Sequence, residues 1–218
     1  MEAIATADAP AAGPGATELR IRRSALECIG RAGLSGTTVD DIARAAGVSR
    51  ATTYRLFPGG RDTIIDAVVG QEVQRFFGGL AGELARHAEA EPLLVAGVGR
   101  ALRFLAGHAA LQAVLRREPD VLAAPIATHR LGPAIDAAVA FAAPYLRPHV
   151  PEGPDADRRA TEVAELVVRL VLSYALQPGG TLDPDDDASV TRFVRTHLLP
   201  SLLADPPPTD PPSPEELP

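Results

Sequence analysis

The sequence of 218 residues contains one cysteine, Cys28, and aromatic residues make up only 4% of it. One cysteine cannot form an intramolecular disulfide, and no N-terminal segment combines a basic end with an apolar run and a cleavage site. These absences predict a cytoplasmic protein. The longest uncharged apolar run, residues 137–146, is half as long as a bilayer span and contains Pro144, so we expect no membrane partner.

Residue patterns typical of enzymes and metal sites are also missing. The sequence has no Gly-rich phosphate loop and no nucleophile elbow. Its five histidines, at positions 87, 108, 129, 149 and 197, lack the spacing of metal ligands. We therefore expect neither catalytic residues nor a cofactor or metal.

The charge is unevenly distributed along the chain. The net charge is -7, and every basic residue is arginine. Residues 18–61 hold eight arginines and four acids, a net +4, whereas residues 62–218 hold thirteen arginines and twenty-two acids, a net -9. A basic N-terminal part fits either a solvated basic face or a nucleic-acid partner.

Four segments follow from composition and periodicity. Residues 1–17 are mostly Ala, Gly and Pro, and residues 205–218 are half proline, so both are expected to be disordered arms. Helical patterns punctuated by Gly and Pro fill the rest, without strand alternation, which predicts an all-α fold. The helical part divides into a basic segment at 18–61 and a larger acidic segment at 62–204.

The expected helices outside residues 37–57 follow from the spacing of apolar residues and from capping signals. Thr17 is expected to cap the first of them, and Pro144 is expected to kink or end the helix that contains it. The predicted ranges are 18–32, 62–90, 91–107, 109–117, 120–130, 133–147, 156–177 and 185–203.

The stretch "TTVDDIARAAGVSRATTYRLF", residues 37–57, predicts two short helices joined by a tight corner. Thr38 and Asp41 form a capping-box-like start. Gly47 permits a sharp reversal, and Ser49 can cap the second helix. The face of the first helix that should be buried consists of Val39, Ile42, Ala43 and Ala46. This arrangement is typical of a helix-turn-helix.

The first turn of the second short helix exposes Arg50, Ala51 and Thr52, with Tyr54 and Arg61 close by. Such a turn can enter a major groove while neighbouring hydroxyl and guanidinium groups contact phosphates. The alternative is a corner inside an ordinary helical bundle, which would require the same Gly47 and the same apolar spacing. The net positive charge of this part favours DNA binding.

The stretch "TTVDDIARAAGVSRATTYRLFPGGRD", residues 37–62, together with the preceding "RAGLSG", resembles the DNA-binding domain of the TetR/AcrR (tetracycline-repressor) family. The resemblance covers about 50 residues. It implies a three-helix helix-turn-helix domain and a larger C-terminal domain that binds a small effector and forms a homodimer through its last two helices. The implied DNA-binding residues are Thr38, Ser49, Arg50, Ala51, Thr52, Tyr54 and Arg61, of which Arg50, Ala51 and Thr52 face bases.

The sequence departs from the common family pattern at two places. "FPGGRD" is one residue longer than the commoner family form, and Arg61 stands near the place of a lysine. The resemblance therefore fixes the register of Arg61 against a phosphate less closely than that of Tyr54. Thr53 stands where an aliphatic residue is usual. Its hydroxyl either bonds to a backbone carbonyl or makes that helix face less stable.

The helix at 156–177 carries few polar residues after Thr161, namely Glu162, Glu165, Arg169 and Ser173. They form one narrow stripe, so we expect this helix to be covered on two sides, by its own core and by a partner subunit. Asp185, Asp186 and Asp187 are expected to complement the start of the last helix rather than to bind metal.

The same resemblance places an effector pocket in the second domain. The candidate ligand-binding residues are Phe77, Leu102, Arg103, Leu105, His108, Gln112, His129, Leu170 and Tyr174. A lining rich in aliphatic side chains favours an aliphatic or lipid-like effector. Two functions stay open: a repressor released from a pseudo-palindromic operator by a small molecule, and a DNA-binding protein that responds to a protein partner or acts architecturally.

Overall fold

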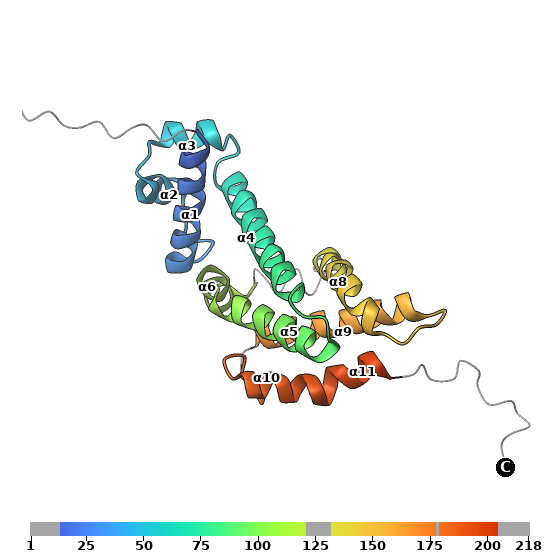
Figure 1. Ribbon diagram of the computed structural model, residues 1–218. Coiled ribbons are helices and arrows are strands. Elements are labelled where there is room, and N and C mark those ends of the chain that lie inside the picture. The colour runs from blue at the N-terminus through green and yellow to red at the C-terminus, as the bar shows by residue number, and fades with distance from the viewer. Residues whose placement is uncertain (1–13, 121–131, 178, 205–218) are drawn as a thin grey trace, which may run out of the picture. The chain divides into compact units, whose positions relative to one another are not determined.

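The computed structural model describes residues 14–120, 132–177 and 179–204 (Figure 1). All regular elements in these ranges are helical, which confirms the all-α prediction. None of the described helices alone has the length and apolar character of a membrane span; only α5 and α6 taken together meet those criteria. The helices are α1 (Pro14–Ala32), α2 (Val39–Ala46), α3 (Arg50–Leu56), α4 (Arg61–Leu84), α5 (Ala90–Gly107), α6 (Ala109–Arg117), α8 (Gly132–Leu146), α9 (Ala156–Leu176), α10 (Asp187–Phe193) and α11 (Leu199–Leu203), with the 3-10 turn η1 (Arg147–His149) and the π turn η2 (Val194–Leu198).

Three sequence predictions concern residues outside the described ranges. They are the helix at 120–130, except its first residue, the arm at 205–218, and residues 1–13 of the N-terminal arm. The last four residues of that N-terminal arm, 14–17, belong to α1. Thr17 therefore lies inside the first helix, and the prediction that it caps this helix was wrong.

The chain divides into two compact units. The first unit comprises residues up to Arg75 together with residues 108–122, and the second comprises residues 76–107 and the chain from residue 123 onward. The domain boundary expected from the sequence is residue 61, where α4 begins. In the structure, the boundary between the two compact units lies inside α4, after Arg75. Helix α6 belongs to the same unit as α1 to α3, whereas α5 belongs to the other unit.

The first unit is built around a small apolar core. Its helices α1, α2 and α4 and the residue that ends α3 contribute Ile21, Ala25, Ile42, Ala46, Phe57, Ile64 and Val68. Helix α6 packs on α1, and the two backbones approach closely at Gly30, where an added Cβ would lie 3.8 Å from the Cβ of Ala109. Small side chains at such crossings let helices pack closely.

The carboxylate of Glu118, which directly follows α6, fixes the loop between α1 and α2. Both of its oxygens accept the backbone N–H of Ser35 at 3.0 Å, and Oε2 also accepts the Ser35 hydroxyl at 2.5 Å. These bonds join residues 83 positions apart. They lower the pKa of Glu118 from its usual value, first through the Ser35 hydroxyl and to a smaller extent through backbone N–H groups and Arg61.

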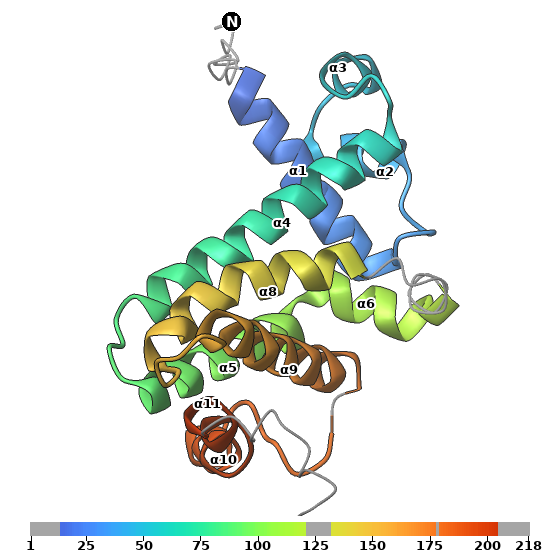
Figure 2. The same ribbon diagram turned by 90° about the vertical axis from the view of Figure 1, so that its right-hand side faces the viewer.

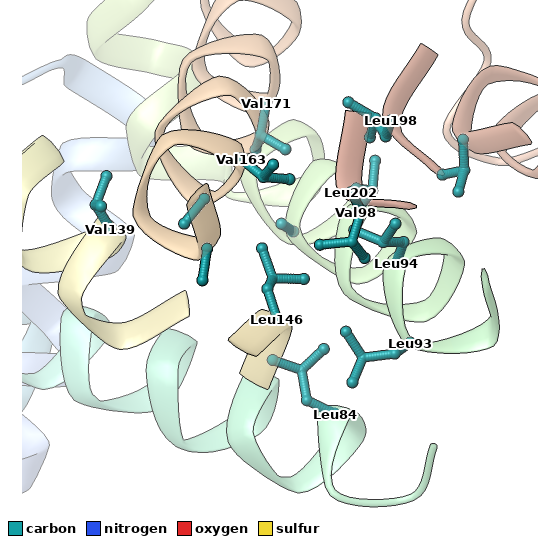
Figure 3. Close-up of a cluster of buried hydrophobic side chains, with 14 of the residues drawn as sticks. Leu84, Leu93, Leu94, Val98, Val139, Leu146, Val163, Val171, Leu198 and Leu202 are labelled. Carbon is teal, nitrogen blue, oxygen red and sulfur yellow. The ribbon is translucent and has the colours of Figure 1, made fainter. Parts of the chain in front are cut away.

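The second unit has a larger core, part of which is shown in Figure 3. Helix α9 packs against α8 and α5, and α10 and α11 pack against α5 and α9 respectively. Leu84, Leu94, Leu146, Val163 and Leu202 are among the core side chains, each from a different helix. Together they hold five helices on one apolar centre.

Two helices of the second unit differ from the sequence-based expectation. Helix α8 continues through Pro144 and ends two residues later at Leu146, where η1 follows. The helix expected at 185–203 begins at Asp187 and contains the π turn η2 before α11. Pro200 stands at the start of α11 and has no N–H to donate to the preceding turn, so a wider turn there leaves its ring room.

The Glu118 bonds make a pH-dependent contribution to stability. Because folding lowers the pKa of Glu118 below its usual 4.5, the contribution is present above that value and is lost as the pH falls through the lower folded value. Glu118→Gln should therefore be less stable than the wild type at pH 7, and the difference should shrink as the pH falls below 4.5. Urea unfolding at a series of pH values measures this.

The matched control is Glu27→Gln, which alters an exposed glutamate of α1 that lies 4.0 Å from Arg23. Its stability difference from the wild type should be small over the same pH range. Equal pH dependence in the two variants would show that the Glu118 bonds do not stabilise the loop.

Candidate nucleic-acid interface

Helix α2 begins with a complete capping box. The backbone N–H of Asp41 donates to Thr38 Oγ1 at 3.2 Å, and the backbone N–H of Thr38 donates to Asp41 Oδ2 at 3.3 Å. The pKa of Asp41 is lowered, first by the Thr38 hydroxyl. This confirms the predicted start of the helix and leaves Thr38 exposed at its end.

The corner between α2 and α3 also follows the prediction. Gly47 has φ 63° and ψ 37°, in the left-handed region where a side chain is disfavoured. Ser49 caps α3 by accepting the backbone N–H of Thr52 at 3.1 Å. The buried residues of α2 are the four predicted ones, Val39, Ile42, Ala43 and Ala46.

Thr53 is fully buried, and its hydroxyl donates to the carbonyl of Ser49 at 3.2 Å. Of the two alternatives for this residue, the structure therefore selects the bond to a backbone carbonyl. Its neighbours on the other face of α3 stay accessible: Arg50, Ala51 and Tyr54 are exposed, and Thr52 is partly so. Helix α3 thus buries one side and presents the predicted residues on the other.

Arg50 is held on the exposed face of α3 by two neighbours. Its Nη1 donates to Oδ2 of Asp40, on α2, at 3.2 Å. Its guanidinium carbon lies 5.6 Å from the centre of the Tyr54 ring, within the range of a cation–π contact. The pKa of Arg50 is raised, first by hydrogen bonding with the Tyr54 hydroxyl and next by the charge of Asp40. Asp40 is not among the DNA-binding residues predicted from the sequence.

Gly60, in the turn between α3 and α4, gives room for Tyr54. It has φ 66°, and a Cβ at this position would lie 3.1 Å from Cε1 of the tyrosine ring. Any other residue there would strain the backbone and press on the ring. The second glycine of the "FPGGRD" turn thus leaves room for the Tyr54 ring, a role that the sequence pattern alone did not reveal.

Arg61, at the start of α4, makes most of its contacts within the protein. Its Nε donates to the carbonyl of Thr37 at 2.9 Å, and its Nη2 donates to that of Leu34 at 2.6 Å. Its Nη1 lies 3.4 Å from Asp62. The side chain is 34% exposed. Arg61 therefore fixes the segment that leads into Thr38, in addition to any contact with a phosphate.

The polar candidates for ligand binding that the structure describes are divided between the two units. His108 caps α6 by accepting the backbone N–H of Leu111, and it lies 3.3 Å from Glu72. Gln112 is also on α6, so both belong to the first unit. Arg103, in the second unit, donates to the carbonyl of Pro184 at 2.9 Å and to Asp187 at 3.3 Å. His129 lies outside the described residues.

The apolar candidates Leu102, Leu105, Leu170 and Tyr174 lie in or against the core of the second unit. Three of them, Leu102, Leu170 and Tyr174, line a space of about 180 Å³ that is nowhere wide enough for a water molecule. These side chains therefore pack on their neighbours without leaving a preformed cavity.

The remaining candidate, Phe77, belongs to a run of aromatic rings in the second unit. Phe77 lies 5.0 Å from Phe76 and 4.7 Å from Phe141, measured between ring centres. Phe76 is 5.1 Å from Phe104, and Phe141 is 5.4 Å from Tyr145. All five rings are half-buried. Four of the six phenylalanines thus meet between α4, α5 and α8, although their spacing in the sequence gives no sign of it.

The part of the chain that the structure describes contains no group of three or more His, Cys, Asp or Glu residues placed to hold a metal ion. In the acidic triplet, Asp186 caps α10 by accepting the backbone N–H of Ala188 at 3.0 Å. This is the capping role expected of an acid at a helix start.

Comparison with known proteins also identifies a DNA-binding domain in the N-terminal part. Residues 21–68 match the family model of the bacterial regulatory proteins of the tetR family. HTH-type transcriptional regulators from two strains of Mycobacterium tuberculosis, CDC 1551 and H37Rv, are each 29% identical to the chain over 166 residues. The match covers 76% of this chain and 77% of each relative.

Solved structures extend the similarity to most of the chain. The TetR family repressor AlkX of Dietzia sp. strain DQ12-45-1b, implicated in biodegradation of n-alkanes, is 26% identical with a TM-score of 0.57, covering 88% of this chain and all of that one. A TetR-family regulator from Pectobacterium atrosepticum, 18% identical, shares the fold with a TM-score of 0.61 over 89% of this chain and 97% of its own. Residues 21–68 therefore form a DNA-binding domain of the tetR family, with the α2–α3 corner as its helix-turn-helix, and most of the chain resembles transcriptional regulators of that family.

Proposed function

We propose that the protein is a dimeric repressor that binds a pseudo-palindromic operator and leaves it when a small lipophilic effector binds the second unit. The observation that carries this proposal is the exposed face of α3. It presents Arg50, Ala51, Thr52 and Tyr54 on a helix whose opposite side is anchored by buried Thr53. Arginine can bond to guanine in the major groove, and hydroxyl groups can bond to phosphates.

Dimerisation is supported by apolar side chains left exposed on the second unit. Leu166 of α9 is 39% exposed and lies within the stripe formed by Glu162, Arg169 and Ser173. Leu203, at the end of α11, is 50% exposed, and α9 and α11 pack on each other (Figure 2). A two-fold axis through α9 and α11 would bury exposed apolar side chains of these helices in both subunits and present two α3 helices to successive major grooves.

A lipophilic effector is supported by the run of five half-buried rings around Phe77. An alkyl chain gains dispersion contacts along such rings without any buried charge, whereas a flat cation also needs carboxylates. The relationship to AlkX, implicated in biodegradation of n-alkanes, points to the same class of ligand. Because the apolar core around Leu102 has no room for a water molecule, binding there would require the core to open.

The DNA-binding role predicts different effects at two positions of α3. If Arg50 reads a guanine, Arg50→Ala should lose about 1 to 3 kcal/mol of discrimination at one base pair. Tyr54→Phe keeps the ring beside Arg50 and removes a hydroxyl that can bond to a phosphate and that also hydrogen-bonds with Arg50. It should weaken binding to all sequences and reduce discrimination less than Arg50→Ala does. Selection from a random DNA library gives the operator, and fluorescence anisotropy on single-base variants measures both effects. Unchanged affinity and preference in Arg50→Ala would contradict the base-reading assignment.

The dimer surface predicts that a charge at Leu166 separates the subunits. Leu166→Asp should halve the mass measured by light scattering and abolish tight operator binding while the helix content from circular dichroism stays the same. The matched control is Val69→Asp, which alters a residue of α4 that is 55% exposed and should leave the dimer intact. A Leu166→Asp protein that still dimerises and binds the operator would exclude this surface.

The effector site predicts a selective rise in melting temperature. A saturating long-chain fatty acid or fatty alcohol, present at about 100 times its dissociation constant, should stabilise the native protein by roughly 2.7 kcal/mol, and a flat cationic dye should not. Phe77→Ala should lose most of the shift. Leu19→Ala, which shortens a side chain of α1 that is 58% exposed, should keep it. Absence of any shift with the wild type would favour control by a protein partner.

A further inference from the structure

Arg50 is held by a carboxylate that belongs to a different helix. Asp40 is the second residue of α2, and its Oδ2 accepts a hydrogen bond from Arg50, the first residue of α3, at 3.2 Å. The Tyr54 ring, one turn along α3, provides a second contact at 5.6 Å. We propose that Asp40 is a specificity-determining positioning residue, which holds Arg50 in the orientation that reads a base. The proposal rests on DNA binding through α3.

The ion pair is too exposed to serve mainly for stability. The side chains of Arg50 and Asp40 are 65% and 51% exposed, and exposed ion pairs add little to the free energy of folding. What the pair does change is the freedom of a long side chain. An arginine with many rotamers loses that freedom when it binds a base, and an arginine already held in place loses less.

The geometry leaves the guanidinium able to bind a base. A guanidinium carries five N–H donors. The bond to Asp40 uses one of them, on Nη1, and the hydrogen bond with the Tyr54 hydroxyl uses at most one more. Donors therefore remain for a bidentate contact, in which two N–H groups of the arginine bond to O6 and N7 of one guanine. The adjacent carboxylate cannot take over the role of Asp40, because Asp41 is bonded to Thr38 and to Arg44.

A carboxylate on the DNA-facing side has a cost that makes the proposal testable. It repels phosphates, so Asp40 should lower affinity for DNA of any sequence while it raises discrimination at one base pair. If Asp40 only stabilised the start of α2, its removal would change neither the preferred base nor the ratio of affinities between that base and the others. The two effects of removing Asp40 should therefore have opposite signs.

The experiment compares Asp40→Asn with the wild type on the selected operator, on operators changed at the base pair read by Arg50, and on unrelated DNA. We expect discrimination at that base pair to fall by about tenfold and binding to unrelated DNA to rise by roughly two- to fivefold. Asp40→Glu, which keeps the charge, should recover part of the discrimination. The control is Asp66→Asn, which removes an exposed carboxylate on α4 and should leave discrimination unchanged.

A double-mutant cycle with Arg50→Ala tests whether Asp40 acts through Arg50. In an Arg50→Ala background, Asp40→Asn should cause no further loss of discrimination, because the two residues act as one unit. A full additional loss would mean that Asp40 reads a cytosine directly, which would overturn the positioning role. Unchanged discrimination in Asp40→Asn itself would also overturn it.

Failure of this inference is distinguishable from failure of the proposed function. If the wild type selects no sequence from the random library, the proposed operator-binding function fails. If it selects an operator and Arg50→Ala loses the preference while Asp40→Asn keeps it, only the role of Asp40 is wrong.

Discussion

Helices of eight and seven residues are too short to persist in water, since isolated helices below about 12 to 15 residues are marginal. Helices α2 and α3 therefore depend on burying one side of each against α1 and α4. Ile21, Ile42 and Ile64, all fully buried, meet at the centre of that core. Once it forms, the caps at Thr38 and Ser49 and the left-handed Gly47 fix the angle of α3. The exposed face of α3 then follows as the side that the core leaves uncovered.

The features that the sequence predicted are those determined by neighbouring residues. The capping box, the Gly47 corner and the Ser49 cap each depend on residues within four positions of one another, and the buried face of α2 lies within eight consecutive residues. Local geometry of this kind is specified by residue type and spacing alone. The same holds for α6, whose bounds agree with the prediction.

The features that the sequence did not predict arise from contacts between distant residues. Glu118 meets Ser35 across 83 positions, and Arg61 donates to Leu34 across 27. Asp40 and Arg50 are 10 positions apart on different helices, and their approach depends on the corner angle. The rings of Phe77 and Phe141 meet only after α4 and α8 have packed. No local pattern encodes these encounters, because each requires the tertiary fold first.

The π turn in the last helix affects which residues of that helix face the core. Val190, Val194, Leu198 and Leu202 are spaced four apart, and all are at most 1% exposed. In a regular α-helix, a residue four positions further along lies about 40° around the axis, so three such steps would move Leu202 by about 120°. The wider turn at Val194–Leu198 unwinds the helix and reduces this rotation. An every-fourth-residue stripe, which would spiral around a regular helix, thereby stays straight enough to pack along a single groove.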